Sequence, residues 1–210
     1  MDAKEEHMAL TLTPRFSVAV DYARQVHMGW RKGTSVPYLA HLLGVASIVM
    51  GESGHIPFTV TEDMVIAALL HDAVEDEGGL PRLQDIEEKF GREVADIVKS
   101  CTDSFEVDSN QKQEWEPRKT SYIGRLRAEP DSTLLVSAAD KLYNARAILE
   151  DYREVGAKVW QRFKRGRTQQ LWYFDELIKV FEERCGDWRI TKELKRVVAE
   201  LSRISANEVS

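Results

Sequence analysis

The sequence contains few cysteines and no long apolar run. Cys101 and Cys185 are its two cysteines; they lack the spacing of a metal motif and make a poor disulfide framework. No apolar stretch approaches the ~20 residues that a membrane span needs, and the acidic start does not resemble a signal peptide. We therefore expect reduced thiols, no membrane span and a cytoplasmic location.

The chain also lacks an excess of positive charge. Its formal net charge is -6, which argues against general binding to nucleic acid, because such binding depends on many Lys and Arg contacts to phosphates. Any phosphate site must therefore be local. The length of 210 residues, with 43% hydrophobic and 30% charged residues, suits one compact domain. We predict a disordered tail at residues 1–13 and a single domain at residues 14–205.

Strand patterns are missing as well, and apolar residues recur at helical spacing instead. No alternation with a period of two lasts long enough to build a sheet, and no internal repeat is visible. We expect an all-α bundle of about eight to ten helices. The first expected helix begins at Thr13 and Pro14, the second carries His41, and the third runs from Thr61 to His71. Further helices are expected at residues 83–90, 94–98, 133–152, 159–185 and 190–204.

The segment at residues 103–117 is polar and ends at Pro117. We interpret it as a loop. It either covers a site or is a solvated connector between helices.

The most informative segment is residues 71–76, with the sequence HDAVED. His71 and Asp72 are both metal-ligand side chain types. Adjacent residues point about 100° apart around a helix, so the two can bind one cation only near a helix end, with further ligands from other elements. This pair therefore predicts a metal site with partners elsewhere in the chain.

His41 and Asp140 are the candidate partners, because each is a polar side chain within an apolar helical run. A lone histidine on an apolar face is often a hydrogen-bonded core residue, and a lone aspartate is often a cap or a paired charge. The neighbouring pair His71 and Asp72 favours the ligand interpretation. Together the four residues form a plausible site of two histidines and two aspartates.

Glu75 and Asp76 are the candidate catalytic residues. Glu75 follows Asp72 by three residues, so on a continuing helix its carboxylate would face the same side and could orient a water or take its proton. The alternative is a solvated acidic turn. A metal-bound water needs a neighbouring base, which favours the catalytic interpretation.

Candidate substrate contacts come from basic, aromatic and amide side chains. Arg31 and Lys32 could lie along a base and neutralise phosphate, or could form a basic surface turn. Arg167 and Tyr173 lie in and after the basic run at residues 158–167, whose alternative is a basic helix face above a core stripe. Asn144 follows Asp140 by one helical turn and could reach a group bound at the metal.

These motifs, in this order, resemble those of the HD-domain phosphohydrolases. The basic pair before Pro37 and Tyr38, the HDxxED form of residues 71–76 and the segment ADKLYN at residues 139–144 are similar to the hydrolase half of the Rel/Spo stringent-response enzymes, and most similar to the small alarmone hydrolases. The resemblance runs from about residue 16 to about residue 185. Two departures are Leu42, where the family usually has proline, and Ser137, where it often has lysine.

The resemblance implies hydrolysis of the 3′-pyrophosphate of guanosine alarmones such as ppGpp, giving GDP or GTP and pyrophosphate. It also implies manganese, although mixed imidazole and carboxylate ligands alone would allow iron, cobalt or zinc. One alternative keeps the metal site but acts on another nucleotide, such as NADPH, a dNTP or a pyrophosphorylated RNA end. Another is a nucleotide-binding module without turnover. No residues remain for a synthetase domain after about Cys185, so we expect degradation without synthesis.

Overall fold

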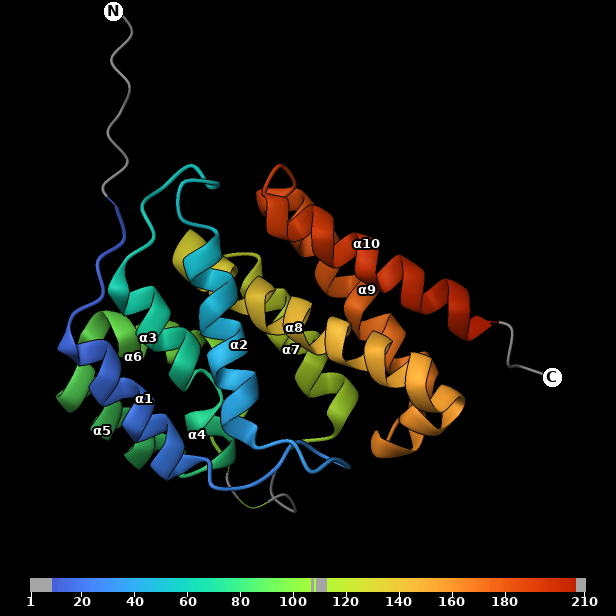
Figure 1. The fold of residues 1–210 in the computed structure, drawn as a ribbon, viewed down its shortest axis with the longest axis horizontal. Coiled ribbons are helices and arrows are strands. Elements are labelled where there is room, and N and C mark those ends of the chain that lie inside the picture. The colour runs from blue at the N-terminus through green and yellow to red at the C-terminus, as the bar shows by residue number, and fades with distance from the viewer. Residues whose placement is uncertain (1–8, 107, 109–112, 207–210) are drawn as a thin grey trace, which may run out of the picture.

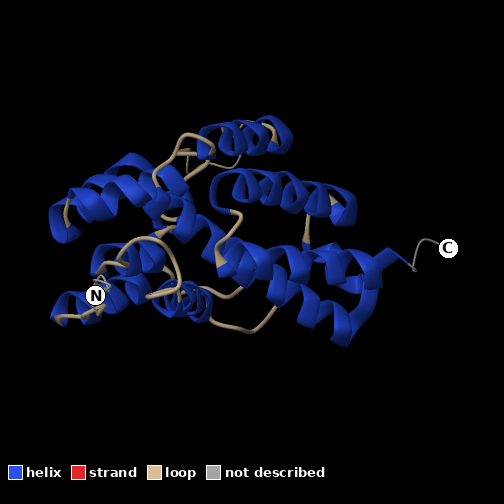
Figure 2. Cartoon of the chain, turned by 90° about the horizontal axis from the view of Figure 1, so that it is seen from above, coloured by secondary structure: helices blue, strands red, loops and turns tan. Residues whose placement is uncertain are grey.

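The computed structural model describes residues 9–106, 108 and 113–206. Within these ranges the chain consists of helices and loops without a named strand, as Figures 1 and 2 show. The predicted all-α fold is therefore confirmed. The helices are α1 (Pro14–Val26), α2 (Tyr38–Gly51), α3 (Glu62–Leu70), α4 (Ala73–Asp76), α5 (Gly79–Phe90), α6 (Arg92–Cys101), α7 (Trp115–Leu126), α8 (Asp131–Val155), the 3-10 helix η1 (Gly156–Arg162), α9 (Gly166–Cys185) and α10 (Arg189–Ser205).

Two threonines start helices as the sequence predicted. The Thr13 hydroxyl accepts a hydrogen bond from the backbone N–H of Arg15, and the Thr61 hydroxyl accepts one from Met64, so each satisfies an orphan donor of a first turn. The Glu62 carboxylate also accepts from the Thr13 backbone N–H at 2.6 Å. The starts of α1 and α3 are therefore tied together. Residues 1–8, most of the predicted tail, lie outside the described residues.

Helix α8 is the centre of the bundle. It lies between α2 and α10 in Figure 1 and also packs against α3 and α6. Its first half, from Leu134 to Leu142, is buried apart from Lys141, so Asp140 lies within the core, with 5% of its surface exposed. No described helix combines the length and apolar character needed to cross a membrane.

The structure corrects two of the predicted elements. Trp115 and Pro117 belong to α7, so the loop predicted at residues 103–117 ends too late; proline is tolerated there because the first N–H groups of a helix have no partner within it. Residues 107 and 109–112 of that loop lie outside the described residues. The helix predicted at residues 159–185 is divided into η1 and α9, and Gly166, with φ of 67°, begins the second part.

Candidate metal centre and active site

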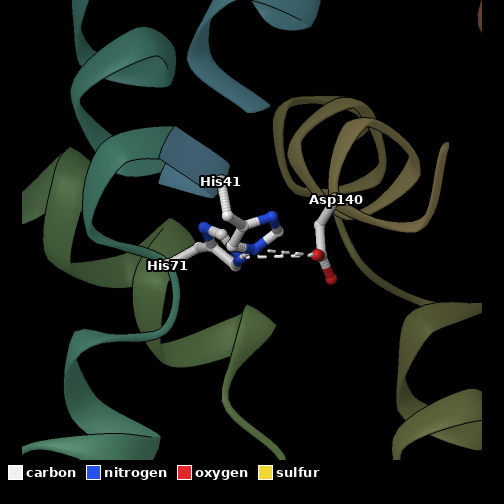
Figure 3. Close-up of side chains that lie close together, drawn as sticks. All are labelled: His41, His71 and Asp140. Carbon is white, nitrogen blue, oxygen red and sulfur yellow. Dashed lines mark hydrogen bonds and ion pairs between the residues drawn. The ribbon is translucent and has the colours of Figure 1, made fainter. Parts of the chain in front are cut away.

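The four predicted ligands converge at one point. His41 extends from α2, Asp140 from α8 and His71 from the end of α3 (Figure 3). Asp72 follows His71 and precedes α4. The Nε2 atoms of the two histidines are 3.3 Å apart. Asp72 Oδ2 lies 3.3 Å from the first imidazole and 3.2 Å from the second, and Asp140 Oδ1 lies 3.4 Å and 3.5 Å from them. His71 and Asp72 follow the last residue of α3. Adjacent residues can bind one cation only near a helix end, so this position agrees with the expectation from the sequence.

This donor set fits a divalent metal ion. Ligand atoms about 2.0–2.2 Å from one cation lie about 3–3.5 Å from one another, which matches the separations in the cluster. His41, His71 and Asp140 offer ligand atoms that all lie within 4.8 Å of one another. The His71 Nδ1–H donates to the Ala68 carbonyl at 2.8 Å, which leaves Nε2 free to bind a cation.

Electrostatic interactions keep the two carboxylates of the cluster ionised. Burial alone would raise the pKa of Asp140, but Lys141, whose Nζ is 2.5 Å from Oδ2, and His71 hold it below its ordinary value. His71 likewise lowers the pKa of Asp72 against burial. Burial lowers the pKa of His41 and so favours the neutral imidazole that a cation requires. Burial opposes protonation of His71, but the two aspartates raise its pKa, so a proton competes with a cation there.

The acidic pair of α4 lies at the same place. Glu75 Oε1 accepts a hydrogen bond from Arg118 Nη1 at 3.1 Å. Asp76 is more exposed, and its Oδ2 accepts from the Tyr38 hydroxyl at 3.2 Å; that hydroxyl also donates to Asp72 Oδ2 at 2.6 Å. Burial raises the pKa of Glu75 to about 7. Glu75 is therefore not part of a solvated turn, and it can accept or give a proton near neutral pH.

A cavity of about 510 Å³ opens beside the cluster, a size typical of small-molecule sites. Four of the five predicted substrate-binding residues line it: Arg31, Lys32, Asn144 and Tyr173. The ammonium groups of Lys119 and Lys141 lie over the ring of Tyr173, at 5.0 Å and 5.7 Å from its centroid. This wall of the cavity therefore carries two ammonium groups, which are paired with Asp103 and Asp140.

Arg31 connects the outer part of the cavity with the cluster. Its Cζ lies 5.5 Å from the ring centroid of Tyr38 and 6.0 Å from that of Tyr143. Its Nη2 donates to Asn144 Oδ1 at 2.6 Å, and Asn144 Nδ2 donates to Asp140 Oδ1 at 2.5 Å. A group stacked against Arg31 would thus be joined to Asp140, a predicted metal ligand, through the side-chain amide of Asn144.

Comparison with known proteins agrees with this geometry. Residues 19–170 match the family described as the HD domain. The chain belongs to the HD-domain family. The guanosine-3′,5′-bis(diphosphate) 3′-pyrophosphohydrolase MESH1 of Mus musculus is 32% identical over 182 residues, which are 79% of this chain and 92% of the relative.

Two further relatives of this HD-domain chain differ in length and in sequence identity. A guanosine-3′,5′-bis(diphosphate) 3′-pyrophosphohydrolase of Aquifex aeolicus is 27% identical over 84% of this chain, which spans only 22% of that longer protein. The solved structure of a metazoan ortholog of SpoT, which hydrolyses ppGpp, has a TM-score of 0.70 and 23% identity, covering 91% of this chain and 97% of its own. This likeness shows the fold.

The remaining predicted residue, Arg167, does not reach the cavity of the HD domain. Its Nε donates to Ser205 Oγ at 2.9 Å and its Nη2 to the Ser202 carbonyl at 3.5 Å, so it joins the start of α9 to the end of α10. No local sequence pattern predicts this contact, because it joins residues 35 and 38 positions apart that only the folded chain brings together. The prediction of Arg167 as a substrate contact is not supported.

Five polar residues that support the site were not predicted from the sequence. They are Tyr38, Asp103, Arg118, Lys119 and Lys141. Tyr38 and Lys141 could have been predicted as site residues, because they lie within the motifs at residues 31–38 and 139–144. Asp103, Arg118 and Lys119 lie in no such motif, and their contacts join segments that only the folded chain brings together.

Proposed function

We propose that the chain is a metal-dependent pyrophosphohydrolase that removes the 3′-pyrophosphate of (p)ppGpp to give GDP or GTP and pyrophosphate. The observation that carries the proposal is one cavity lined by His71, Asp72 and Asp140 of the His/Asp cluster, by the acidic pair and by two lysines. The enzyme names of the relatives support the same substrate. A nucleotide with a pyrophosphate group has both the planar base and the charge that such a cavity can bind.

Mn²⁺ is the proposed cofactor, and His41, His71, Asp72 and Asp140 are its proposed ligands. When bound there, the ion polarises the phosphorus centre and lowers the pKa of water. Imidazole and carboxylate ligands do not single out one metal, so the choice of manganese rests on the family resemblance. The positions of the ligands on α2, α8 and the α3 to α4 junction would hold such an ion at the inner end of the cavity.

The proposed catalytic residues act on the attacking water. Glu75 orients the water and takes its proton, which its pKa of about 7 permits near neutral pH. Asp76 is the second member of the pair, and Tyr38 holds it near Asp72 through a shared hydroxyl. The water oxygen forms a bond to the phosphorus attached to the ribose 3′ oxygen, and the bond from that phosphorus to the 3′ oxygen breaks. The departing 3′ oxygen takes up the proton that Glu75 received from the water.

The remaining residues bind the substrate. Arg31 stacks on the base, and Lys32 neutralises a phosphate at the outer end of the cavity. Asn144 reaches the group next to the cluster, and Tyr173 lies along the nucleotide. The ammonium groups of Lys119 and Lys141 beside that tyrosine offset negative charge on the pyrophosphate group that is transferred to water.

A nucleotide panel tests the proposal. Purified protein with Mn²⁺ is incubated with ppGpp, pppGpp, NADPH, a dNTP and a 5′-triphosphate RNA, and pyrophosphate and phosphate are measured. We expect pyrophosphate from ppGpp and pppGpp, and Glu75→Gln should bind ppGpp but turn it over at least about 100-fold more slowly. No product from ppGpp would overturn the proposal. Phosphate or pyrophosphate from another member of the panel would then identify the substrate, and binding alone would indicate a module without turnover.

We also propose the chain-wide properties expected from the sequence. Residues 14–205 are one domain, in agreement with a buried apolar cluster to which helices α1 to α10 all contribute. The enzyme works in the cytoplasm and does not bind nucleic acid in general, in line with its net charge of -6. Cell fractionation and a filter-binding assay with duplex DNA check these two properties.

A further inference from the structure

A cluster of charges joins α7 to the loop after α6, beside the acidic pair. Arg118 Nη1 contacts Asp103 Oδ1 and also lies 3.1 Å from Glu75 Oε1. Lys119 Nζ donates to Asp103 Oδ2 at 2.5 Å. The side chain of Asp103 is 3% exposed and that of Arg118 is 14% exposed. One guanidinium nitrogen therefore bridges two carboxylates from distant parts of the chain.

Stability of the fold does not account for this arrangement. Removing charges from water is costly, and a buried ion pair often contributes less stability than well-packed apolar side chains would. Helix α7 is already fixed by its buried residues Tyr122, Ile123 and Leu126. The charged cluster is therefore better explained by what lies next to it. Among the described residues it contacts the acidic pair at Glu75, through Arg118 and through a side-chain hydrogen bond between Asp103 and Glu75.

The cluster has the properties of an anchor. Burial alone would raise the pKa of Asp103, but Lys119 and Arg118 hold it below its ordinary value, so it remains charged. Asp103 and Glu75 line the cavity, whereas Arg118 is not among the described residues that do. The guanidinium is thus placed behind the carboxylates, where it touches Glu75 but would not contact a bound nucleotide.

We propose that Asp103 and Arg118 form a clamp that fixes the Glu75 carboxylate at the wall of the cavity. This inference rests on the proposed function, in which Glu75 acts on the attacking water. A free glutamate samples several rotamers, and loss of orientation costs rate without loss of substrate binding. Asp103 and Arg118 are therefore positioning residues that act through Glu75.

A double-mutant cycle tests the clamp. Arg118→Gln, Arg118→Lys and Asp103→Asn are made in the wild-type and Glu75→Gln backgrounds, and kcat and KM for ppGpp are measured with Mn²⁺. We expect Arg118→Gln to lower kcat about 10- to 100-fold and to change KM less than about threefold. Arg118→Lys should restore part of kcat. In the Glu75→Gln background, Arg118→Gln should lower kcat by no more than about twofold, because residues that act as a unit are not additive.

Arg125→Gln is the matched control. Arg125 lies on the same helix and donates to the Thr102 carbonyl at 2.9 Å, so it joins α7 to the same loop without touching Glu75. We expect this variant to lose thermal stability and to keep the wild-type kcat. An equal loss of kcat in Arg125→Gln, or a full loss for Arg118→Gln in the Glu75→Gln background, would overturn the clamp.

Crystal structures separate this inference from the proposed function. In Arg118→Gln, or in Asp103→Asn if the first variant does not fold, the Glu75 side chain should leave the position that it has in the wild type. An unchanged Glu75 would refute the clamp whatever the substrate is. If the wild type releases no pyrophosphate from ppGpp, the proposed function fails and the position of Glu75 alone decides the clamp.

Discussion

At the scale of single residues, the ionisation of Glu75 makes a prediction about pH. Burial raises its pKa from 4.5 to about 7, so the protonated form dominates below that value. A general base must be deprotonated, and kcat/KM should therefore rise with pH until the carboxylate is fully charged. A divalent cation nearby favours the charged form of Glu75. In the metal-loaded enzyme the rise of kcat/KM with pH should therefore have its midpoint at or below pH 7. A pH profile of kcat/KM for ppGpp checks this prediction, and the acidic rise should disappear in Glu75→Gln.

Gly44 makes a second prediction at this scale. A Cβ atom at Gly44 would lie 2.1 Å from Cε2 and 2.5 Å from Cδ2 of Tyr143, so an alanine must displace that ring. The ring packs against His41, with centroids 4.9 Å apart, and lies beside Arg31. We expect Gly44→Ala to lower stability by about 1–3 kcal/mol and to raise KM for ppGpp several-fold.

Gly124→Ala is the control for this substitution. Gly124 is exposed within α7, and a Cβ there meets nothing within 4 Å. Its replacement should stabilise the protein by about 0.5–1 kcal/mol through helix propensity and leave KM unchanged. Thermal melts and steady-state kinetics on the two variants decide the matter, and a stable Gly44→Ala with normal KM would contradict the proposed packing role.

At the scale of elements, the turn that carries Arg31 and Lys32 makes a third prediction. Gly33 in this turn has φ of 72°, and an added Cβ would lie 2.8 Å from Arg162 Cγ on η1. Gly33→Ala therefore combines backbone strain with a clash that moves the turn away from the cavity. We expect KM for ppGpp to rise more than kcat falls, because under the proposed function the turn binds substrate and carries no catalytic group.

Gly54→Ala separates the two effects in this prediction. Gly54 has a similar φ of 76°, but a Cβ there meets nothing within 4 Å. It should lose about 1–3 kcal/mol of stability through strain alone and keep the wild-type KM. Equal KM values in the two variants would show that the turn does not depend on its contact with η1.

The elements also show what the sequence could and could not predict. His41 and Asp140 were recognisable because a polar side chain within an apolar helical run needs a partner, and the threonine caps gave two helix starts. Helix α7 was missed because Pro117 at its third position resembles the end of a loop. The contact between Arg118 and Glu75 joins residues 43 positions apart. No local pattern encodes such a contact, because it depends on how α7 packs in the folded chain.

At the scale of the whole molecule, the candidate metal centre joins parts of the chain that are distant in sequence. Its ligands come from α2, from the junction of α3 with α4, and from α8, and the last of these is also packed against α6 and α10. Unfolding separates all of these segments. A cation at the cluster would therefore bind the folded chain and not the unfolded one.

This difference in binding predicts that Mn²⁺ stabilises the whole fold. At a free concentration of about 100 times Kd, a ligand specific for the folded state contributes about 2.7 kcal/mol, which corresponds to roughly 5–11 °C in Tm for a domain of this size. We expect Mn²⁺ to raise the Tm of the chelated wild type by this amount and to have little effect on His41→Gln. His55→Gln is the control, because His55 is exposed and lies outside the cavity, and it should respond as the wild type does. An equal response of His41→Gln would place the stabilising ion elsewhere, since a cation held at the cluster cannot lose the ligand that α2 supplies without losing affinity.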